Sequence, residues 1–438
     1  MTDGRTIQST EIHRIKIVTA DTCDTDGNLS LGHLLKWMDA TSCMSAERLA
    51  KRCCVTLLMD DLNFTQGVNV KQGHRVYLDA CVTKAWGSSC EVRVNAVCAT
   101  HPGGRITRQF ADVRFVYVIL KTEKEIAEKI KVRLPKLNID AMNFYQKKEW
   151  ELAEKRKHFR RNRGKLIEKM SMSLPELPPQ PQLNLGQSMF VRKSASPSLP
   201  MKSEASRLVQ MWELVLPLHA NHMGNTFGGQ IMLWMSKVAF ETAWKFVGYD
   251  NRHKFIPVCI DQVLFLAPSH VGDRLQFVAK VTRVFKTSLE VKVSVFGGNV
   301  TSNDSKLINE AFVTYVYASG DDDKVWIGKE IESCEDLIEN EEYSPALGRR
   351  ALRLQRLATQ NLLRTFKDLD ESQDGLLSKQ ELLHALTSSV VVKRCIQRRG
   401  FNSEAFLKHL LASVTTDKGV DFEAYNNAVE TFFEKTDE

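Results

Sequence analysis

The chain of 438 residues carries one sequence pattern twice, about 200 residues apart, and this repeat constrains its fold more than any other feature. GNLSLG at 27–32 aligns with GNTFGG at 224–229, and HLLKWMDATS and QIMLWMSKVA directly follow them. Farther along, VKQGHRVYLDACVTKAWGSSCEVRVNAV aligns with SHVGDRLQFVAKVTRVFKTSLEVKVSVF, and ADVRFVYVIL aligns with NEAFVTYVYA. We therefore predict two homologous domains, at residues 8–122 and 206–320.

Both copies follow one order of elements: a short strand, a polar turn, a long apolar helix and then several strands. Valine, phenylalanine, tyrosine and threonine at every second position are typical of half-buried strands. The helices expected at 32–50 and 229–247 are apolar on nearly all sides, so each must be enclosed. The prediction for each copy is an α+β domain, in which an antiparallel sheet wraps around one long central helix.

Residues 123–205 separate the copies and differ from both in composition. The stretch from Phe144 to Lys169 is helix-like, and its ten Lys and Arg residues against four Glu supply most of the net charge of +7. Because no nucleic-acid motif accompanies this charge, we expect a solvated linker helix and no nucleic-acid partner. Anionic phosphates or an acidic protein surface remain open as partners. The Pro/Ser-rich stretch that follows is expected to be a linker without a core.

The last segment, residues 345–438, resembles neither copy and contains the loop DESQDGLLSKQE at 370–381. This loop matches the calcium-binding loop of an EF-hand, with Gly375 at the sharp turn. The expected calcium ligands are Asp370, Ser372, Asp374, the backbone carbonyl of Leu376, Ser378 and Glu381. A second loop, SVTTDKGVDFEA, has alanine where the bidentate acid belongs, so we expect it to pair with the first without binding an ion. A helical hairpin that keeps the loop shape without an ion is the alternative.

The Gly-Gly step at Gly228 and Gly229 opens the apolar helix of the second copy. Because glycine has no Cβ, backbone N–H groups at this helix start are predicted to be open to a carbonyl, as in an oxyanion hole. If a carbonyl compound bound at this helix start is to be hydrolysed, the site also needs a group that activates water. Asp39 lies seven residues after Gly32 inside the first helix, among apolar neighbours, whereas the second helix has Ser236 in the equivalent place.

The turns before the two helices also differ, and here the second copy has the residue that is better suited to the chemistry. The second copy has Asn221, whose amide can donate to a carbonyl or position a water, and the first copy has Asp24. If the copies pack with turn facing helix, Asn221 and Asp39 make one complete site, and Asp24 with Ser236 makes an inactive or impaired one. Two simpler interpretations stay open: Asp39 is satisfied by a buried neighbour or by the helix dipole, and Asn221 is a turn or cap residue.

The motifs HANHMGNTFGGQIMLWM, GHLLKWMDATSCMSAERLA and SHVGDRLQF followed by FKTSLEV carry a specific resemblance over residues 8–320. The chain resembles the double-hotdog acyl-CoA thioesterases of the cytosolic animal type, although an EF-hand-like tail stands where that type has a START lipid-binding domain. The resemblance implies hydrolysis of acyl-CoA to fatty acid and CoA, with Asn221 and Asp39 in the site and no organic cofactor. It also implies a homotrimer, and CoA-binding residues at two hairpins, namely Lys286, Thr287, Ser288, Ser88 and Ser89.

Two other functions fit parts of the sequence. A non-catalytic acyl-CoA sensor with a calcium-responsive tail would explain the half-decayed second site. A hotdog dehydratase fits less well, because neither helix has a histidine in a suitable acid–base position. If the protein is the thioesterase, calcium in the tail is expected to modulate its activity.

The sequence also bears on location. It contains no run of 18 or more apolar residues, so we expect no membrane span, and its first residues lack a secretory signal. The ten cysteines are scattered without metal-like spacing, as is typical of reduced thiols. We therefore predict a cytoplasmic protein. The acyl chain length that it accepts does not follow from the sequence.

Overall fold

The computed structural model describes residues 5–60, 62–64, 70–99, 108–173, 207–221, 223–249, 254–299, 305–319, 327–328, 331, 337, 340–370, 372–378, 380–382 and 420–425. The chain divides into two compact units. Unit 1 comprises Met1–Asn138 and Arg161–Arg350, and unit 2 comprises Ile139–Arg160 and Ala351–Glu438. Both predicted repeats fall within unit 1.

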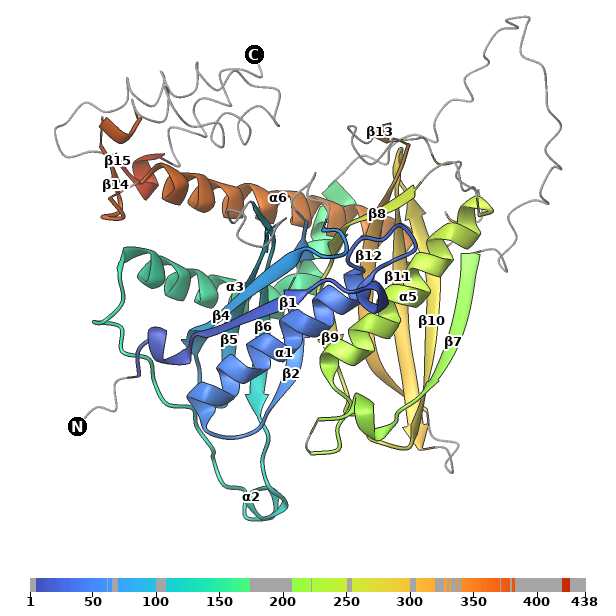
Figure 1. Ribbon diagram of the computed structural model, residues 1–438, viewed down its shortest axis with the longest axis horizontal. Helices are drawn as coiled ribbons and strands as arrows, with labels where there is room; N and C mark the ends of the chain where they lie inside the picture. Colours follow the sequence, from blue (N-terminus) through green and yellow to red (C-terminus); the bar gives the residue numbers. More distant parts are fainter. Residues whose placement is uncertain are drawn as a thin grey trace, which may run out of the picture. The chain divides into compact units, whose positions relative to one another are not determined.

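The first repeat folds as one long helix against an antiparallel sheet, in the predicted order of elements (Figure 1). Its helix, α1, spans Leu31–Ala50, and Ser30 caps the start by accepting a hydrogen bond from the N–H of His33. The other elements of this repeat are η1 (Gln8–Thr10), β1 (Ile12–Ile17), η2 (Ala20–Thr22), β2 (Cys54–Met59), β3 (Leu62–Asn63), β4 (Arg75–Ala85), β5 (Ser89–Ala99) and β6 (Arg108–Ile119).

The second repeat builds the same set of elements. Its helix, α5, spans Gly228–Val247 and ends at Gly248, whose φ of 77° is a left-handed conformation that favours glycine. The other elements are β7 (Leu208–Leu214), η3 (Pro217–His219), β8 (Lys254–Ile260), β9 (Val263–Phe265), β10 (Asp273–Val284), β11 (Ser288–Asn299), β12 (Lys306–Ser319) and β13 (Ile327–Gly328).

The two repeats share one continuous sheet. Its strand order is β1-β4-β5-β6-β2-β9-β12-β11-β10-β7, and β3, β8 and β13 pair outside this path. Strands β2 and β9 form the junction between the repeats, where Leu58 pairs with Leu264 and Met59 with Val263. From the edge inward, the first half of the sheet runs β1-β4-β5-β6 and the second half runs β7-β10-β11-β12, and these strands match one by one. The two repeats are therefore related by an approximate twofold symmetry.

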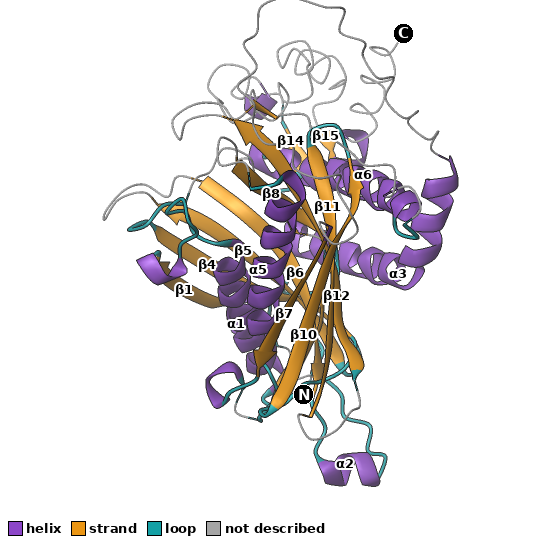
Figure 2. Ribbon diagram, turned by 90° about the vertical axis from the view of Figure 1, so that its right-hand side faces the viewer, coloured by secondary structure: helices purple, strands orange, loops and turns teal. Residues whose placement is uncertain are grey.

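Helices α1 and α5 lie side by side, as two views of the structure show (Figure 1, Figure 2). A Cβ built on Gly229 would lie 2.7 Å from the Cα of Lys36, and one on Gly32 would lie 2.9 Å from the Cα of Leu233. The start of each helix therefore touches the second turn of the other, which makes the helices antiparallel. Any side chain at these two positions would push the partner backbone away.

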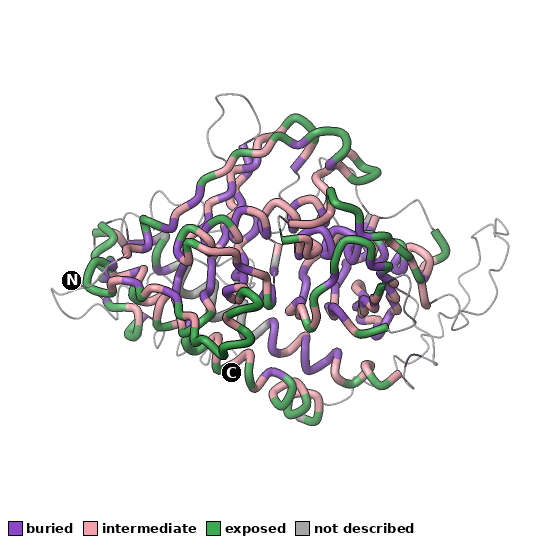
Figure 3. The backbone as a smooth tube through the Cα atoms, turned by 90° about the horizontal axis from the view of Figure 1, so that it is seen from below, coloured by how far each residue is buried: buried purple, intermediate pink, exposed green. Residues whose placement is uncertain are grey.

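The core of unit 1 lies between the sheet and these two helices. Strands alternate between buried and less buried residues, as the sequence predicts (Figure 3). The fully buried strand positions include Val76, Leu78, Val92, Val94, Leu275, Phe277, Val291 and Val293. Among the described residues, no helix is long and apolar enough to cross a membrane.

The segment between the repeats contains α2 (Glu123–Ala127) and α3 (Phe144–Ser173). The helix predicted from Phe144 is present, and the expectation that it is solvated holds for one side of it only. Tyr145, Ala153 and Arg163 are each less than 10% exposed. The many charges of α3 concealed these positions, which give the helix a buried side.

The tail of the chain contributes α6 (Tyr343–Leu369), β14 (Leu376–Leu377) and β15 (Val420–Asp421). In unit 2, Leu377 pairs with Val420, so the two predicted loops lie against each other as expected. The rings of Phe366 and Tyr425 pack 5.4 Å apart next to this pair, and both side chains are buried. Residues 413–419 of the second loop lie outside the described residues.

Candidate active site

Asp39 is a fully buried carboxylate in the third turn of α1, with 0% of its surface exposed. Its Oδ2 accepts a hydrogen bond from the backbone N–H of Gly229 at 2.7 Å, across the boundary between the repeats. Its Oδ1 accepts hydrogen bonds from the hydroxyls of Thr56 at 2.9 Å and Tyr117 at 2.8 Å. Three donors therefore fix the plane of the carboxylate, and all three favour its ionised form.

Two opposing effects act on the pKa of Asp39. Burial raises this pKa above that of an ordinary carboxyl, and the hydrogen bonds from Tyr117, Gly229 and Thr56 lower it by less. Burial also raises the pKa of the nearby Cys43 thiol and of the Tyr117 phenol, so both are neutral near pH 7. A carboxylate whose pKa is raised by burial accepts a proton more readily than an exposed one.

The Gly-Gly step lies at the predicted helix start, but other side chains fill the space that its missing Cβ atoms leave. A Cβ on Gly229 would lie 3.2 Å from the Cβ of Asp39, and one on Gly228 would lie 3.0 Å from the ring of Phe265. The N–H of Gly229 is already donated to Asp39. The expectation of an open N–H at Gly229 is therefore wrong in this conformation, because an anionic acceptor already satisfies the positive end of the helix.

Asn221 closes the turn that leads into α5. Its Oδ1 accepts hydrogen bonds from the N–H groups of Met223 at 2.9 Å and Asn225 at 3.1 Å. Because two N–H donors require an oxygen, the orientation of the amide is fixed, with its Oδ1 toward the backbone of the turn. The interpretation of Asn221 as a turn residue therefore holds, and the turn ends seven residues later at the helix start that Asp39 contacts.

The same turn exists in the first repeat with different chemistry. The Oδ1 of Asp24 accepts hydrogen bonds from the N–H groups of Asp26 and Asn28, each at 3.0 Å. Ser236, the counterpart of Asp39, donates its hydroxyl to the carbonyl of Leu233 at 2.8 Å. The start of α1 therefore faces a hydroxyl where the start of α5 faces a carboxylate.

Strand register extends this comparison to the hydroxyl donors. Thr56 is paired with Tyr117 across β2 and β6, and Pro257 is paired with Tyr315 at the matching position of β8 and β12. Tyr315 is buried like Tyr117, but proline has no hydroxyl to offer. The sequence interpretation missed Thr56 and Tyr117. The aligned repeats contained part of the signal, because the half-buried Thr56 of the first repeat aligns with Pro257 of the second.

The predicted CoA-binding residues lie in two matching hairpins: Lys286, Thr287 and Ser288 between β10 and β11, and Ser88 and Ser89 between β4 and β5. A backbone hydrogen bond closes each hairpin, from Phe285 to Ser288 at 2.7 Å and from Trp86 to Ser89 at 2.8 Å. Lys286 and Ser88 are exposed. The structure gives the hairpins the same shape and leaves their role in CoA binding a prediction.

The predicted calcium loop is folded within unit 2. Gly375 has a φ of 87°, and its N–H donates to Oδ2 of Asp370 at 2.8 Å. The carboxylate of Glu381 accepts hydrogen bonds from the N–H groups of Ser372 at 2.9 Å and Ser378 at 2.8 Å. In the described parts of the chain, no three Asp, Glu, His or Cys side chains are grouped as a metal site. Calcium binding therefore remains a prediction.

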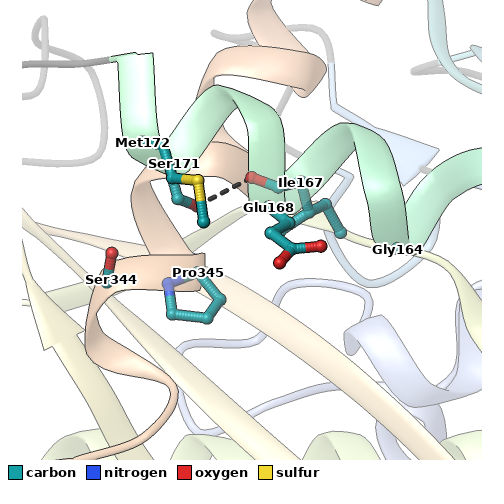
Figure 4. Close-up of a pocket in the computed structure, with 7 residues that line it drawn as sticks. All are labelled: Gly164, Ile167, Glu168, Ser171, Met172, Ser344 and Pro345. Carbon is teal, nitrogen blue, oxygen red and sulfur yellow. Dashed lines mark hydrogen bonds between the residues drawn. The ribbon is translucent and has the colours of Figure 1, made fainter.

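A surface hollow of about 350 Å³ lies between α3 and α6 in unit 1 (Figure 4). The helices cross closely there, because a Cβ on Gly348 would collide with the backbone of Ile167. None of the candidate site residues lines this hollow. Its lining consists of Gly164, Ile167, Glu168, Ser171, Met172, Ser344 and Pro345.

Comparison with known proteins agrees with the repeat. Residues 26–103 and 223–302 each match the model of the thioesterase superfamily. The first match contains Asp39 and Thr56, the second contains Gly228 and Gly229, and Asn221 lies two residues before it. The chain belongs to the thioesterase superfamily, with two hotdog domains in tandem.

Two mouse relatives match most of the chain. Acyl-coenzyme A thioesterase 11 of Mus musculus is 34% identical over 326 residues, which cover 72% of this chain and 48% of the relative. Acetyl-coenzyme A thioesterase of Mus musculus is 32% identical over 338 residues, covering 76% of this chain and 55% of the relative. The chain thus spans about half the length of these curated relatives. A crystal structure of acyl-CoA hydrolase from Agrobacterium tumefaciens is 20% identical over 72% of this chain and 98% of its own, at a TM-score of 0.25.

Proposed function

We propose that the protein hydrolyses acyl-CoA thioesters at one composite site between the two hotdog domains. The observation that carries this proposal is the contact of Asp39 on α1 with the N–H of Gly229 on α5, at 2.7 Å. This contact places an acid of the first repeat at the start of α5 in the second repeat, and the turn that contains Asn221 leads into the same helix. The names of the mouse relatives support acyl-CoA as the substrate.

In the proposed reaction, Asp39 acts as general base. Because Thr56 and Tyr117 hold Oδ1, we assign the proton transfer to Oδ2, which accepts one hydrogen bond within the described part of the chain, from Gly229. The water oxygen forms a bond to the thioester carbon as Oδ2 takes a proton from the water. The carbon–sulfur bond then breaks, the proton goes to the leaving sulfur, and the products are a fatty acid and CoA.

The negative charge that develops on the thioester oxygen needs donors. The NH2 group of Asn221 and the first-turn N–H of Gly228 are the proposed donors, while Gly229 orients Asp39. The opposite pair, Asp24 and Ser236, has neither an amide donor in the turn nor a carboxylate base on the helix. We propose that this second site is inactive.

The CoA portion of the substrate is proposed to bind at the hairpin residues Lys286, Thr287 and Ser288, with Ser88 and Ser89 at the matching hairpin. Lysine and hydroxyl side chains on an exposed turn suit phosphate groups, since they offer charge and hydrogen-bond donors. The exposure of Lys286 supports this assignment.

Release of free thiol from short, medium and long acyl-CoAs tests the function. We expect the wild-type chain to release thiol, and Asp39→Ala to lose this activity by about three orders of magnitude while still binding the substrate. Binding is measured separately by calorimetry with a non-hydrolysable acyl-CoA thioether. A wild-type chain that binds acyl-CoA without releasing thiol would be a sensor and would refute the enzyme.

We also propose that the loop at 370–381 holds a calcium ion and that this ion modulates the enzyme. All six proposed ligands offer oxygen, which suits a hard cation, and the left-handed Gly375 bends the loop as such sites require. Tyr145 of α3 donates its hydroxyl to Asp370 in unit 2, so calcium competes with Tyr145 for this ligand. The Tyr145 hydroxyl is expected to weaken binding.

Calcium titration by calorimetry tests the ion site in the full chain. Glu381→Gln is expected to abolish binding, and Tyr145→Phe is expected to tighten it. Equal heats for wild type and Glu381→Gln would refute the site. Modulation is tested by thiol release with calcium and with a chelator, where equal rates would refute it.

We propose that the chain assembles as a homotrimer through its two sheet edges. The edge strands carry exposed apolar side chains at matching positions, Ile15 and Ile17 on β1 and Trp212 and Leu214 on β7. An exposed apolar edge strand favours pairing with another chain. Light scattering of the wild type should give three times the chain mass, and Trp212→Lys should reduce it. A monomeric wild type would contradict the proposal.

The proposed location is the cytoplasm. Eight cysteines in the described part of the chain are free thiols, and burial raises the pKa of Cys54 to about 12. Free thiols are typical of a reducing compartment, and the raised pKa keeps the Cys54 thiol unreactive. Fractionation of cells that express the chain with a tag tests this assignment.

A further inference from the structure

Tyr117 on β6 lies at the centre of a hydroxyl network that ends at Asp39. Its hydroxyl is 2.8 Å from Oδ1 of Asp39, 3.0 Å from the carbonyl oxygen of Asp39 and 2.7 Å from the hydroxyl of Ser42. All three residues have 0% of their surface exposed. Hydrogen bonds in such a buried cluster are strong, because bulk water does not compete for them.

One arrangement of protons suits an ionised Asp39. A carboxylate is a stronger acceptor than a hydroxyl or a peptide carbonyl, so Tyr117 gives its single proton to Oδ1. The Ser42 hydroxyl is 2.8 Å from the carbonyl of Met38 and can donate to that carbonyl or to Tyr117. When Ser42 donates to Tyr117, it supports the phenol oxygen next to Asp39, whose carbonyl oxygen is 3.0 Å from the same Ser42 hydroxyl.

We propose that Tyr117 is a positioning residue for the general base, an inference that rests on the proposed thioesterase function. Its hydroxyl holds Oδ1 of Asp39 so that Oδ2 faces the reacting water. The same hydrogen bond stabilises the carboxylate charge in a buried site. Loss of the hydroxyl should therefore affect catalysis more than substrate binding.

The groups around Asp39 allow a shift of its pKa in a Tyr117 variant to be attributed to the lost hydroxyl. The groups packed around it are Cys43 and Lys36 on α1, Thr56 on β2, Tyr117 on β6 and Gly229 on α5. The Lys36 ammonium is bonded to Oε1 of Gln230 at 2.7 Å, and the Cys43 thiol is neutral near pH 7. Replacement of Tyr117 by phenylalanine thus leaves every charge around Asp39 in place.

The second repeat supplies a matched control. Tyr315 occupies the equivalent position on β12 and is 1% exposed, but it is paired with Pro257 where Tyr117 is paired with Thr56, and the residue aligned with Asp39 is Ser236. Tyr315→Phe removes the same atom from the same strand position at the same depth. A purely structural role of the buried phenol would be shared by both variants.

The test compares Tyr117→Phe with Tyr315→Phe in the full chain by thiol release between pH 5 and 9. For Tyr117→Phe we expect kcat at pH 7 to fall about tenfold with little change in KM, and the acid limb to move up by about one pH unit. Tyr315→Phe should leave both unchanged. Ser42→Ala should shift the limb in the same direction by less, and it serves as the second variant if Tyr117→Phe does not fold.

Two outcomes would overturn the proposal. One is an acid limb that stays in place in both Tyr117→Phe and Ser42→Ala. The other is an equal loss of activity in Tyr117→Phe and Tyr315→Phe, which would indicate a general packing effect.

A second measurement separates this proposal from the proposed function. In urea unfolding, the effect of Tyr117→Phe on the midpoint should shrink when Asp39 is already replaced by serine, and the effect of Tyr315→Phe should not. A wild type without thioesterase activity would refute the proposed enzymatic function. The double-mutant cycle would still show whether the Tyr117 hydroxyl and the Asp39 carboxylate interact. Additive midpoints would refute the coupling of Tyr117 to Asp39.

Discussion

The start of α5 and the start of α1 are built to one plan but differ in what they face. Gly229 meets the carboxylate of Asp39, whereas Gly32 meets the hydroxyl of Ser236. The turns ahead of them have the same hydrogen bonds around Asn221 and Asp24. The starts of α1 and α5 therefore have the same backbone geometry but face different chemical groups.

This difference separates packing from chemistry. Both crossing glycines are present, because a side chain at either would push α1 and α5 apart. The acid and its threonine donor are present once, and the second repeat has Ser236 and Pro257 in their places. A repeat can therefore lose its chemical groups and keep the glycines that pack its helices.

The largest effect should come from exchanging the acid for its counterpart. Asp39→Ser gives the first helix the residue of the second, and we expect kcat to fall by about 10³-fold or more through loss of the base. The control, Ser236→Ala, should change kcat by less than about threefold, since it removes a hydroxyl that bonds its own helix. Thiol release measures both, and similar losses would end the distinction between the two helix starts.

A reciprocal exchange of the turn residues should have the next largest effect. Asn221→Asp keeps the oxygen that accepts from Met223 and Asn225, but replaces the NH2 group with a negative oxygen. We expect kcat to fall by about 10²-fold, as for loss of one oxyanion donor. Asp24→Asn keeps the turn of the first repeat and should retain full activity. If both exchanges were harmless, the amide would have no part in the reaction.

The crossing glycines should have equal effects on stability and unequal effects on activity. We expect Gly229→Ala and Gly32→Ala each to destabilise the fold by about 1–3 kcal/mol, because a Cβ would overpack the helix crossing. Only Gly229→Ala should lower the activity of the folded protein, since it displaces Asp39. Urea unfolding and thiol release are the two measurements. Matching activities would contradict the assignment of the site to the start of α5.

The smallest effect should come from the CoA hairpin. Lys286→Ala is expected to raise KM about fivefold with kcat unchanged, because an exposed lysine contributes a modest, screened attraction to phosphate. Raising the salt concentration should reduce the difference between wild type and variant. Ser88→Ala at the matching hairpin provides the comparison with an uncharged side chain. A change in kcat for Lys286→Ala would place this residue near the chemistry instead.

Much of the fold follows from the sequence. The repeat, the enclosed helices and the alternating strands were all predictable, because hydrophobic periodicity is a local signal. The contact of Asp39 with Gly229 was harder to predict, since it joins residues 190 positions apart. The sequence indicated that the acid and the Gly-Gly step belong together, but it suggested an open N–H group where the structure has a hydrogen bond.

The parts that the sequence did not reveal depend on tertiary packing. Tyr117 is one of many aromatic strand residues, and only the register of β6 against β2 brings it together with Thr56 near Asp39. The buried side of α3 was likewise concealed, because its charged residues dominate its composition. The amino-acid composition of a highly charged helix reflects its exposed side and says little about its buried side.

The pairing of β2 with β9 has a consequence for working concentration. In a site shared by two separate polypeptides, dilution takes the halves apart and the specific activity falls with it. Here one backbone and one uninterrupted ladder of strands join the halves, so the acid meets its helix start with no encounter step. Turnover per chain should then stay constant from micromolar to nanomolar enzyme, even where higher assemblies dissociate.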